Sequence, residues 1–86
     1  MVNMLFLSNL VRVDGQSVPE LSNKIAEKYK NQIVILEGRG KLTAKAVMLA
    51  NALKSYHNAE ILEAVIFSEQ INQKQYESVI RIALKL

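Results

Sequence analysis

The chain has 86 residues, of which 50% are hydrophobic, so it is too apolar for a disordered protein and fits one domain over residues 1–86. It has no cysteine, which excludes disulfides and thiolate metal sites and favours a reducing, cytoplasmic location. Its net charge of +3 is mild, and the apolar stretch at residues 4–13 is too short for a membrane span, so we expect no membrane partner.

The hydrophobic pattern predicts four strands and two helices in the order βαβαββ. In chain order we expect a strand at residues 5–13, a helix at 17–30, a strand at 33–36, a helix at 42–57, and strands at 60–68 and 77–85 joined by a polar hairpin tip at 69–76. Ser17 and Glu20 have capping-box spacing, and Asn58 marks the end of the second helix. The apolar positions with helical spacing are Val18, Leu21, Ile25 and Tyr29 in the first helix and Leu42, Ala46, Leu49, Ala50, Leu53 and Tyr56 in the second.

Two right-handed crossovers in this order place both helices on one face of a mixed four-stranded sheet. The expected fold class is therefore α/β, in the form of an α+β two-layer sandwich. In the last strand, Ile80, Ile82 and Leu84 share one face of the sheet. In the strand before it, Val65 and Phe67 make the odd-numbered face apolar as well. Both faces are more apolar than a monomer of this size requires, so we expect a homodimer.

Positive charge is concentrated in one part of the chain, since residues 38–59 hold four of the eleven basic residues and none of the eight acidic ones. Arg39, Lys41 and Lys45 surround the predicted start of the second helix. A cation there is disfavoured by about 0.3–1 kcal/mol because the helix end is already positive. A bound phosphate would turn this cost into a gain, because the phosphate is negatively charged. The two glycines of this segment would let the backbone of a phosphate-bearing ligand come close to the site. The alternative, which composition alone favours, is a solvated helix face without a ligand.

Two segments of the chain match those of a known family. Residues 39–47, RGKLTAKAV, align without a gap to the run Arg-Gly-Arg-Ala-Ile-Ser-Lys-Ala-Val, and residues 78–85, SVIRIALK, align to Ser-Thr-Ile-Glu-Ile-Ala-Ile-Arg. These runs follow the second strand and form the last strand of Alba proteins, which are small archaeal chromatin and RNA-binding proteins with eukaryotic relatives in RNase P and MRP. The chain therefore resembles the Alba family, and the order of its elements matches over nearly the whole length.

The resemblance implies an Alba-like fold, which is shared with the C-terminal domain of translation initiation factor three. It also implies a non-enzymatic protein that binds DNA or RNA largely independently of sequence, with a nucleoid-associated location if the source is archaeal. Alba proteins pair through the second helix and the last two strands, and their last hairpin is an arm that follows the minor groove. The residues that we expect to bind nucleic acid are Arg39, Gly40, Lys41 and Lys45 in the motif and Arg12, Gln73 and Lys74 elsewhere. Tyr76, at the edge of the hairpin, is the one aromatic residue that could contact a nucleic acid.

Other features leave a second function open. The loop at residues 14–19 lacks the lysines of the Gly-Lys-Lys-Pro loop that contacts DNA in Alba proteins, and Glu37 stands where a basic residue is common. These differences would weaken binding, and the alternative is a protein-interaction or structural subunit that pairs with another, fuller Alba-type subunit or with another protein. We expect no catalytic residue, metal or cofactor, because His57 is a single histidine at a helix end and the carboxylates are scattered.

Overall fold

The computed structural model describes residues 9–86, and its elements follow the predicted order. Of the first predicted strand, residues 5–8 lie outside the described residues. A short 3-10 turn joins the second strand to the second helix. The elements are β1 (Leu10–Arg12), α1 (Val18–Lys28), β2 (Ile33–Arg39), η1 (Gly40–Leu42), α2 (Thr43–His57), β3 (Glu60–Asn72) and β4 (Gln75–Lys85).

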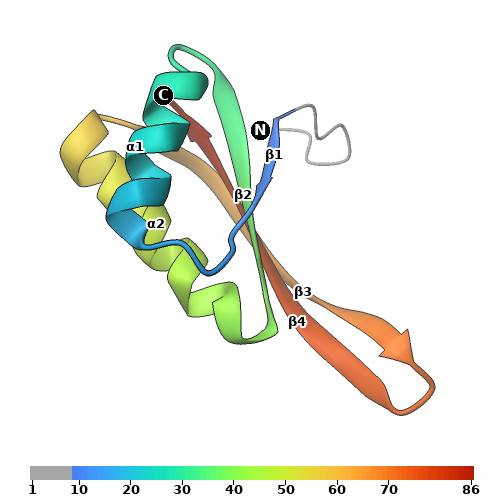
Figure 1. The fold of residues 1–86 in the computed structure, drawn as a ribbon. Coiled ribbons are helices and arrows are strands. Elements are labelled where there is room, and N and C mark those ends of the chain that lie inside the picture. Colours follow the sequence, from blue (N-terminus) through green and yellow to red (C-terminus); the bar gives the residue numbers. More distant parts are fainter. Residues whose placement is uncertain (1–8) are drawn as a thin grey trace.

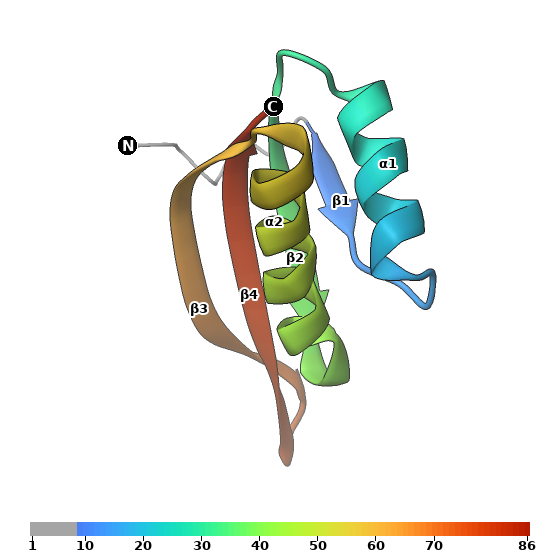
Figure 2. The same ribbon diagram turned by 90° about the vertical axis from the view of Figure 1, so that its left-hand side faces the viewer.

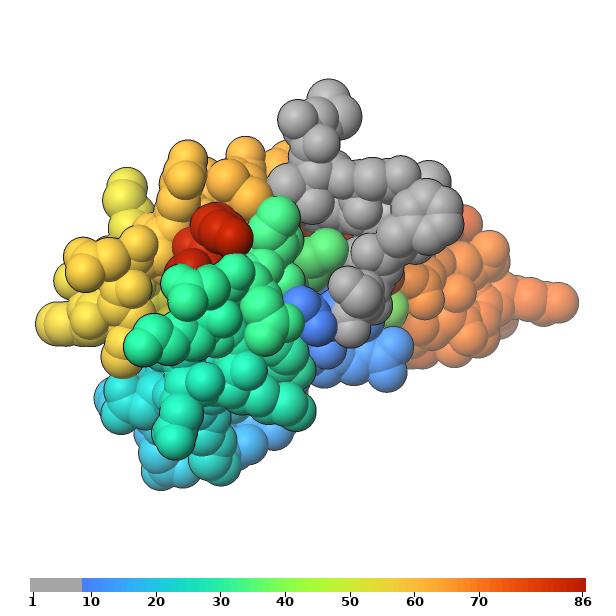
Figure 3. Space-filling model, turned by 90° about the horizontal axis from the view of Figure 1, so that it is seen from above, coloured from blue at the N-terminus to red at the C-terminus, as the bar shows by residue number. Residues whose placement is uncertain are grey.

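The four strands form one mixed sheet in the order β1-β2-β4-β3. β1 runs parallel to β2, whereas β4 runs antiparallel to both β2 and β3. Helices α1 and α2 lie side by side on one face of the sheet, so the predicted fold class is confirmed (Figure 1, Figure 2). The β3–β4 hairpin extends past the start of α2 and projects from the rest of the molecule in the space-filling view (Figure 3).

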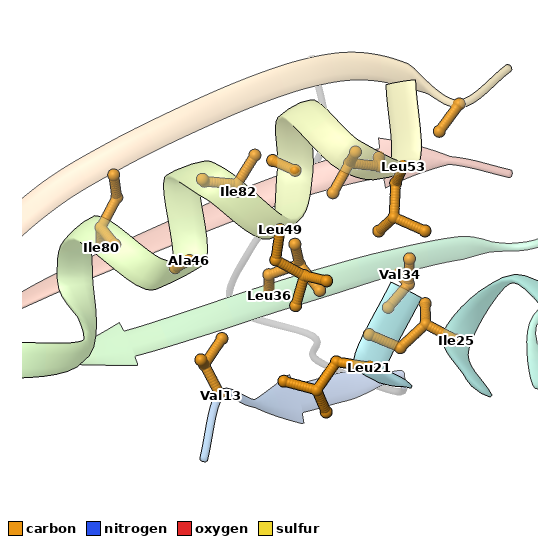
Figure 4. Close-up of a cluster of buried hydrophobic side chains, with 13 residues drawn as sticks. Val13, Leu21, Ile25, Val34, Leu36, Ala46, Leu49, Leu53, Ile80 and Ile82 are labelled. Carbon is orange, nitrogen blue, oxygen red and sulfur yellow. The ribbon is translucent and has the colours of Figure 1, made fainter. Parts of the chain in front are cut away.

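Alternating residues of the two central strands form the core. Ile80, Ile82 and Leu84 of β4 and Val34 and Leu36 of β2 face the helices and are buried. The helices fill the other side of this cluster with Leu21, Ile25, Ala46, Leu49, Ala50 and Leu53 (Figure 4). The even-numbered residues of β2 and β4 therefore face the helices, and the odd-numbered residues face the other side of the sheet.

Local sequence explains where the helices begin and end. The hydroxyl of Ser17 accepts a hydrogen bond from the backbone N–H of Glu20 at 3.3 Å, as the capping-box spacing predicted. α1 ends at Lys28, slightly earlier than predicted, because Tyr29 leaves the helical conformation. α2 ends where Asn58 adopts a left-handed conformation with a φ of 57°, and its N–H donates to the carbonyl oxygen of Leu53.

The prediction that Tyr56 is part of the core is wrong. Its side chain is 81% exposed. It lines an open groove between the two helices, together with Ala52 of α2 and Ser22 of α1. Leu53 occupies the buried position in this last part of α2, and Tyr56 lines the groove instead of the core.

β2 is longer than predicted and runs through Gly38 to Arg39. Gly38 lies on the face of β2 that meets α2. A Cβ atom at this position would lie 2.5 Å from the carbonyl oxygen of Leu42 and 2.7 Å from the Cβ of Ala46. Gly38 therefore serves the close packing of α2 on the sheet, whereas the sequence had suggested that it makes room for a ligand.

We expect Gly38→Ala to lower the free energy of unfolding by about 1–3 kcal/mol, because backbone and helix must shift to admit the new methyl group. The measurement is urea denaturation followed by circular dichroism. Gly15→Ala is the matched control, since nothing lies within 4 Å of a Cβ at that position. Equal stability of the two variants would show that α2 can move away from β2 at little cost.

The polar segment at residues 69–76 is mostly strand, so the hairpin tip is shorter than predicted. β3 continues to Asn72 and β4 begins at Gln75, which leaves Gln73 and Lys74 as the turn. The side-chain oxygen of Asn72 accepts a hydrogen bond from the backbone N–H of Lys74 at 2.9 Å and closes this turn. Polar side chains are tolerated in these strands because both faces of the projecting hairpin are exposed to solvent.

Candidate nucleic-acid interface

The segment between β2 and α2 forms a positively charged helix start. Gly40 has a positive φ of 53°, and its carbonyl oxygen accepts a hydrogen bond from the hydroxyl of Thr43 at 3.0 Å. Neither η1 nor α2 has a side-chain cap at its start, and neither has an acidic residue in its first turn. The positive end of α2 is therefore not neutralised by its own side chains, and Lys41 adds a full charge beside it.

An open groove of about 690 Å³ separates this helix start from the β3–β4 hairpin. Gly40, Lys41 and Thr43 form one wall. The hairpin forms the other wall with Ile71, Lys74, Gln75, Tyr76, Glu77 and Ser78. Two of the predicted cations, Lys41 and Lys74, thus line the same groove, although they are far apart in the sequence.

Arg39 points toward carboxylates and lies outside this groove. Its guanidinium contacts Glu37 at 2.8 Å, Glu69 at 3.3 Å and Glu77 at 3.5 Å, and its side chain is 28% exposed. The hydrogen bonds with Glu37 and Glu69 raise the pKa of Arg39 further above its ordinary value. A phosphate would have to compete with these three partners for the guanidinium.

Glu37 is the centre of an ion-pair cluster on the helix-free side of the sheet. Its carboxylate is fully buried and contacts Arg39 at 2.8 Å, Arg81 at 2.9 Å and Arg12 at 3.3 Å. Burial alone would raise the pKa of Glu37, but the hydrogen bonds and charges of Arg39 and Arg81 outweigh it, and the pKa lies below its ordinary value. With Glu69, the cluster links side chains from all four strands.

The remaining predicted residues do not line the groove. Arg12 is largely exposed but lies on the helix-free side of the sheet beside Glu37. The ammonium of Lys45 donates a hydrogen bond to the backbone oxygen of Asp14 at 2.9 Å, so it faces the loop before α1. Gln73 lies in the exposed turn next to Lys74. The structure thus brings Gly40, Lys41 and Lys74 together and separates them from Arg39, Arg12 and Lys45.

Asp14 places a negative charge beside Lys45. Hydrogen bonds from the backbone N–H and the side chain of Gln16 lower the pKa of Asp14, with smaller contributions from Lys45 and Lys24. The loop before α1 is therefore acidic at neutral pH and offers a phosphate less attraction than the groove does.

Sequence reasoning missed the carboxylate partners of Arg39 and the groove residues Ile71 and Gln75. The sequence did contain one indication of the ion-pair cluster. If the second strand is extended to Arg39, the alternation of side chains along a strand places Glu37 and Arg39 on the same face of the sheet. The contacts with Glu69 and Glu77 depend on strand register and had no sequence signal. Within residues 9–86, no helix is long and apolar enough to cross a membrane, and no group of histidine or acidic residues is placed to hold a metal.

No family model matches the chain, and no curated protein matches its sequence. Solved structures do match. Alba from Thermoplasma volcanium superposes with a TM-score of 0.76 at 21% identity, over 91% of this chain and 100% of that chain. ALBA1 from Trypanosoma brucei superposes with a TM-score of 0.76 at 15% identity, over 90% of this chain and 68% of that chain. At these identities the likeness is one of fold, and the chain therefore has the Alba-like fold that its sequence motif implied.

Proposed function

We propose that the protein is a non-enzymatic, Alba-type nucleic-acid-binding protein that contacts phosphates largely independently of sequence. The observation that carries this proposal is the open groove in which Lys41 and Lys74 lie on opposite walls beside the start of α2. Glu77 also lines this groove, but it is paired with Arg39, which reduces its repulsion of a phosphate. The groove is therefore the part of the described surface best suited to an anion.

The test is fluorescence anisotropy of labelled duplex DNA and duplex RNA at about 50 mM and about 200 mM salt. Two lysines in the groove predict a slope of about −2 per protomer in a plot of log affinity against log salt. The duplex that binds more tightly identifies the preferred nucleic acid. Absence of binding to any nucleic acid at low salt would refute the proposal and favour a role as a protein-interaction subunit.

We also propose that two copies of the chain associate through α2 and β3. Val47 and Met48 on α2 are 41% and 59% exposed, and Ile66 on β3 is 77% exposed. A hollow of about 260 Å³ between the helix and the sheet is lined by Val47, Ile66 and Ile80 among others. A continuous apolar surface of this kind is costly on a monomer, and a second copy would cover it.

Ile66→Asp is expected to convert the dimer into a monomer, because each interface would then bury a charged side chain. Sedimentation equilibrium over micromolar concentrations measures the mass. Ile71→Asp is the matched control, since Ile71 lies on the same strand, is 53% exposed and belongs to the groove near the hairpin tip. A wild-type chain that stays monomeric would contradict self-association and direct attention to a different partner subunit.

A further inference from the structure

We propose that the groove takes single-stranded rather than duplex nucleic acid, with an unpaired base stacked on the ring of Tyr76. This inference rests on the proposed function and names the class of ligand for the same groove. It depends on the apolar part of the groove, which phosphate contacts do not use.

Tyr76 is a large aromatic side chain in an exposed position. It is 68% exposed and pairs with Gln70 across the hairpin. By alternation it is on the same face of β4 as Ile80, which is buried beneath α2. The hairpin continues past the start of α2 (Figure 2), and in this part of β4 Tyr76 is exposed whereas Ile80 is buried.

The groove surrounds this ring with the groups that a single strand needs. Ile71, which is 53% exposed, adds a second apolar side chain, and Gln75 offers an amide to a base edge. Lys41 and Lys74 are placed to bind the flanking phosphates. Stacking of bases on aromatic rings beside cations is the usual way in which proteins hold single strands without reading their sequence.

A duplex would use the groove poorly. Its bases are stacked on one another, so their faces are closed to Tyr76, and only phosphates, sugars and base edges would remain for contact. Duplex affinity depends on the number of phosphate contacts, and the groove offers two lysines because Arg39 is held by Glu37, Glu69 and Glu77. A strand with unpaired bases gains the stacking contact in addition to the same phosphates.

The test compares oligouridine, oligothymidine and a mixed-sequence DNA duplex of equal length at low salt, with the wild type, Tyr76→Ala and Tyr76→Phe. Tyr76→Ala should weaken binding to the single strands by about fivefold to a hundredfold and leave duplex binding unchanged. Tyr76→Phe should retain the affinity of the wild type because it keeps the aromatic ring. The two single strands distinguish RNA from DNA as the source of the unpaired base.

Tyrosine fluorescence supplies a second readout. The chain has three tyrosines and no tryptophan, and Tyr29 and Tyr56 lie outside the groove. A stacked base should quench the wild-type emission, and Tyr76→Phe should bind equally well with that quenching lost. Duplex binding that equals or exceeds single-strand binding, with no effect of Tyr76→Ala, would overturn this inference while the proposed function stands. Absence of binding to every nucleic acid would instead refute the proposed function.

Discussion

Replacing both Lys41 and Lys74 with alanine is expected to weaken nucleic-acid binding by up to about a hundredfold at about 50 mM salt, because each phosphate contact contributes about tenfold there. The two lysines lie on opposite walls of one groove, so both can contact the same strand. The slope of log affinity against log salt should fall in magnitude by about two per protomer. Fluorescence anisotropy over a salt series measures both quantities.

The matched control is the double variant Lys30→Ala and Lys54→Ala. It removes the same net charge from two exposed lysines, one after α1 and one on α2, neither of which lines the groove. We expect a small loss of affinity and an unchanged salt slope, because distant exposed charges are screened. Equal losses in the two double variants would mean that general charge, rather than the groove, attracts the nucleic acid.

Arg39 is unsuited to this test even though it belongs to the sequence motif. Its guanidinium holds Glu37, Glu69 and Glu77, so Arg39→Ala would disturb the ion-pair cluster as well as any phosphate contact. A loss of affinity in that variant could therefore reflect a change in the hairpin rather than a lost contact. The lysine variants avoid this ambiguity because they leave the cluster intact.

Glu37→Gln is expected to lower the free energy of unfolding at pH 7 by about 2–4 kcal/mol. The glutamine has nearly the same volume, but its NH₂ group faces the guanidinium groups of Arg39 and Arg81, which are also donors. The expected cost is below that of fully buried pairs, because the two arginine side chains are 28% and 21% exposed and can turn toward water. Thermal denaturation should show a melting temperature lower by roughly 10–20 °C for a domain of this size.

The same variant should change how stability depends on pH. The pKa of Glu37 in the folded protein lies below its ordinary value of 4.5, so its carboxylate stabilises the fold above that pH. This contribution is lost as the pH falls through the lowered pKa, and Glu37→Gln lacks it at every pH. The difference in stability between wild type and variant should therefore narrow as the pH falls from 5 toward 3.

Glu27→Gln serves as the control for this experiment, since Glu27 is an exposed acid on α1 outside the cluster. Urea denaturation at several pH values between about 7 and 3 gives the free energies to compare. If the Glu37→Gln variant is as stable as the control at pH 7, the ion pairs of the cluster only offset the cost of desolvating their charges and add no net stability. A difference that stays constant with pH would show that the charge of Glu37 is not responsible.

Local sequence was sufficient for the parts of the fold that depend on neighbours along the chain. Ser17 and Glu20 marked the start of α1, and Asn58 marked the end of α2, because capping depends on residues a few positions apart. The alternation of Ile80, Ile82 and Leu84 placed these residues on one face of β4, and the structure shows that this face meets the helices. The order of these elements, together with the motif at residues 39–47, was enough to indicate an Alba-like fold.

The groove and the cluster depend instead on strand register and on contacts between distant segments. Glu37 lies opposite Arg81 and Arg12 because β4 and β1 flank β2 in that register, and no local pattern encodes it. Lys41 and Lys74 line one groove because the long β3–β4 hairpin passes the start of α2. The chain thus specified a cation-rich helix start through its local pattern, whereas three-dimensional packing determined that Arg39 is held by carboxylates and that the two lysines share the open groove.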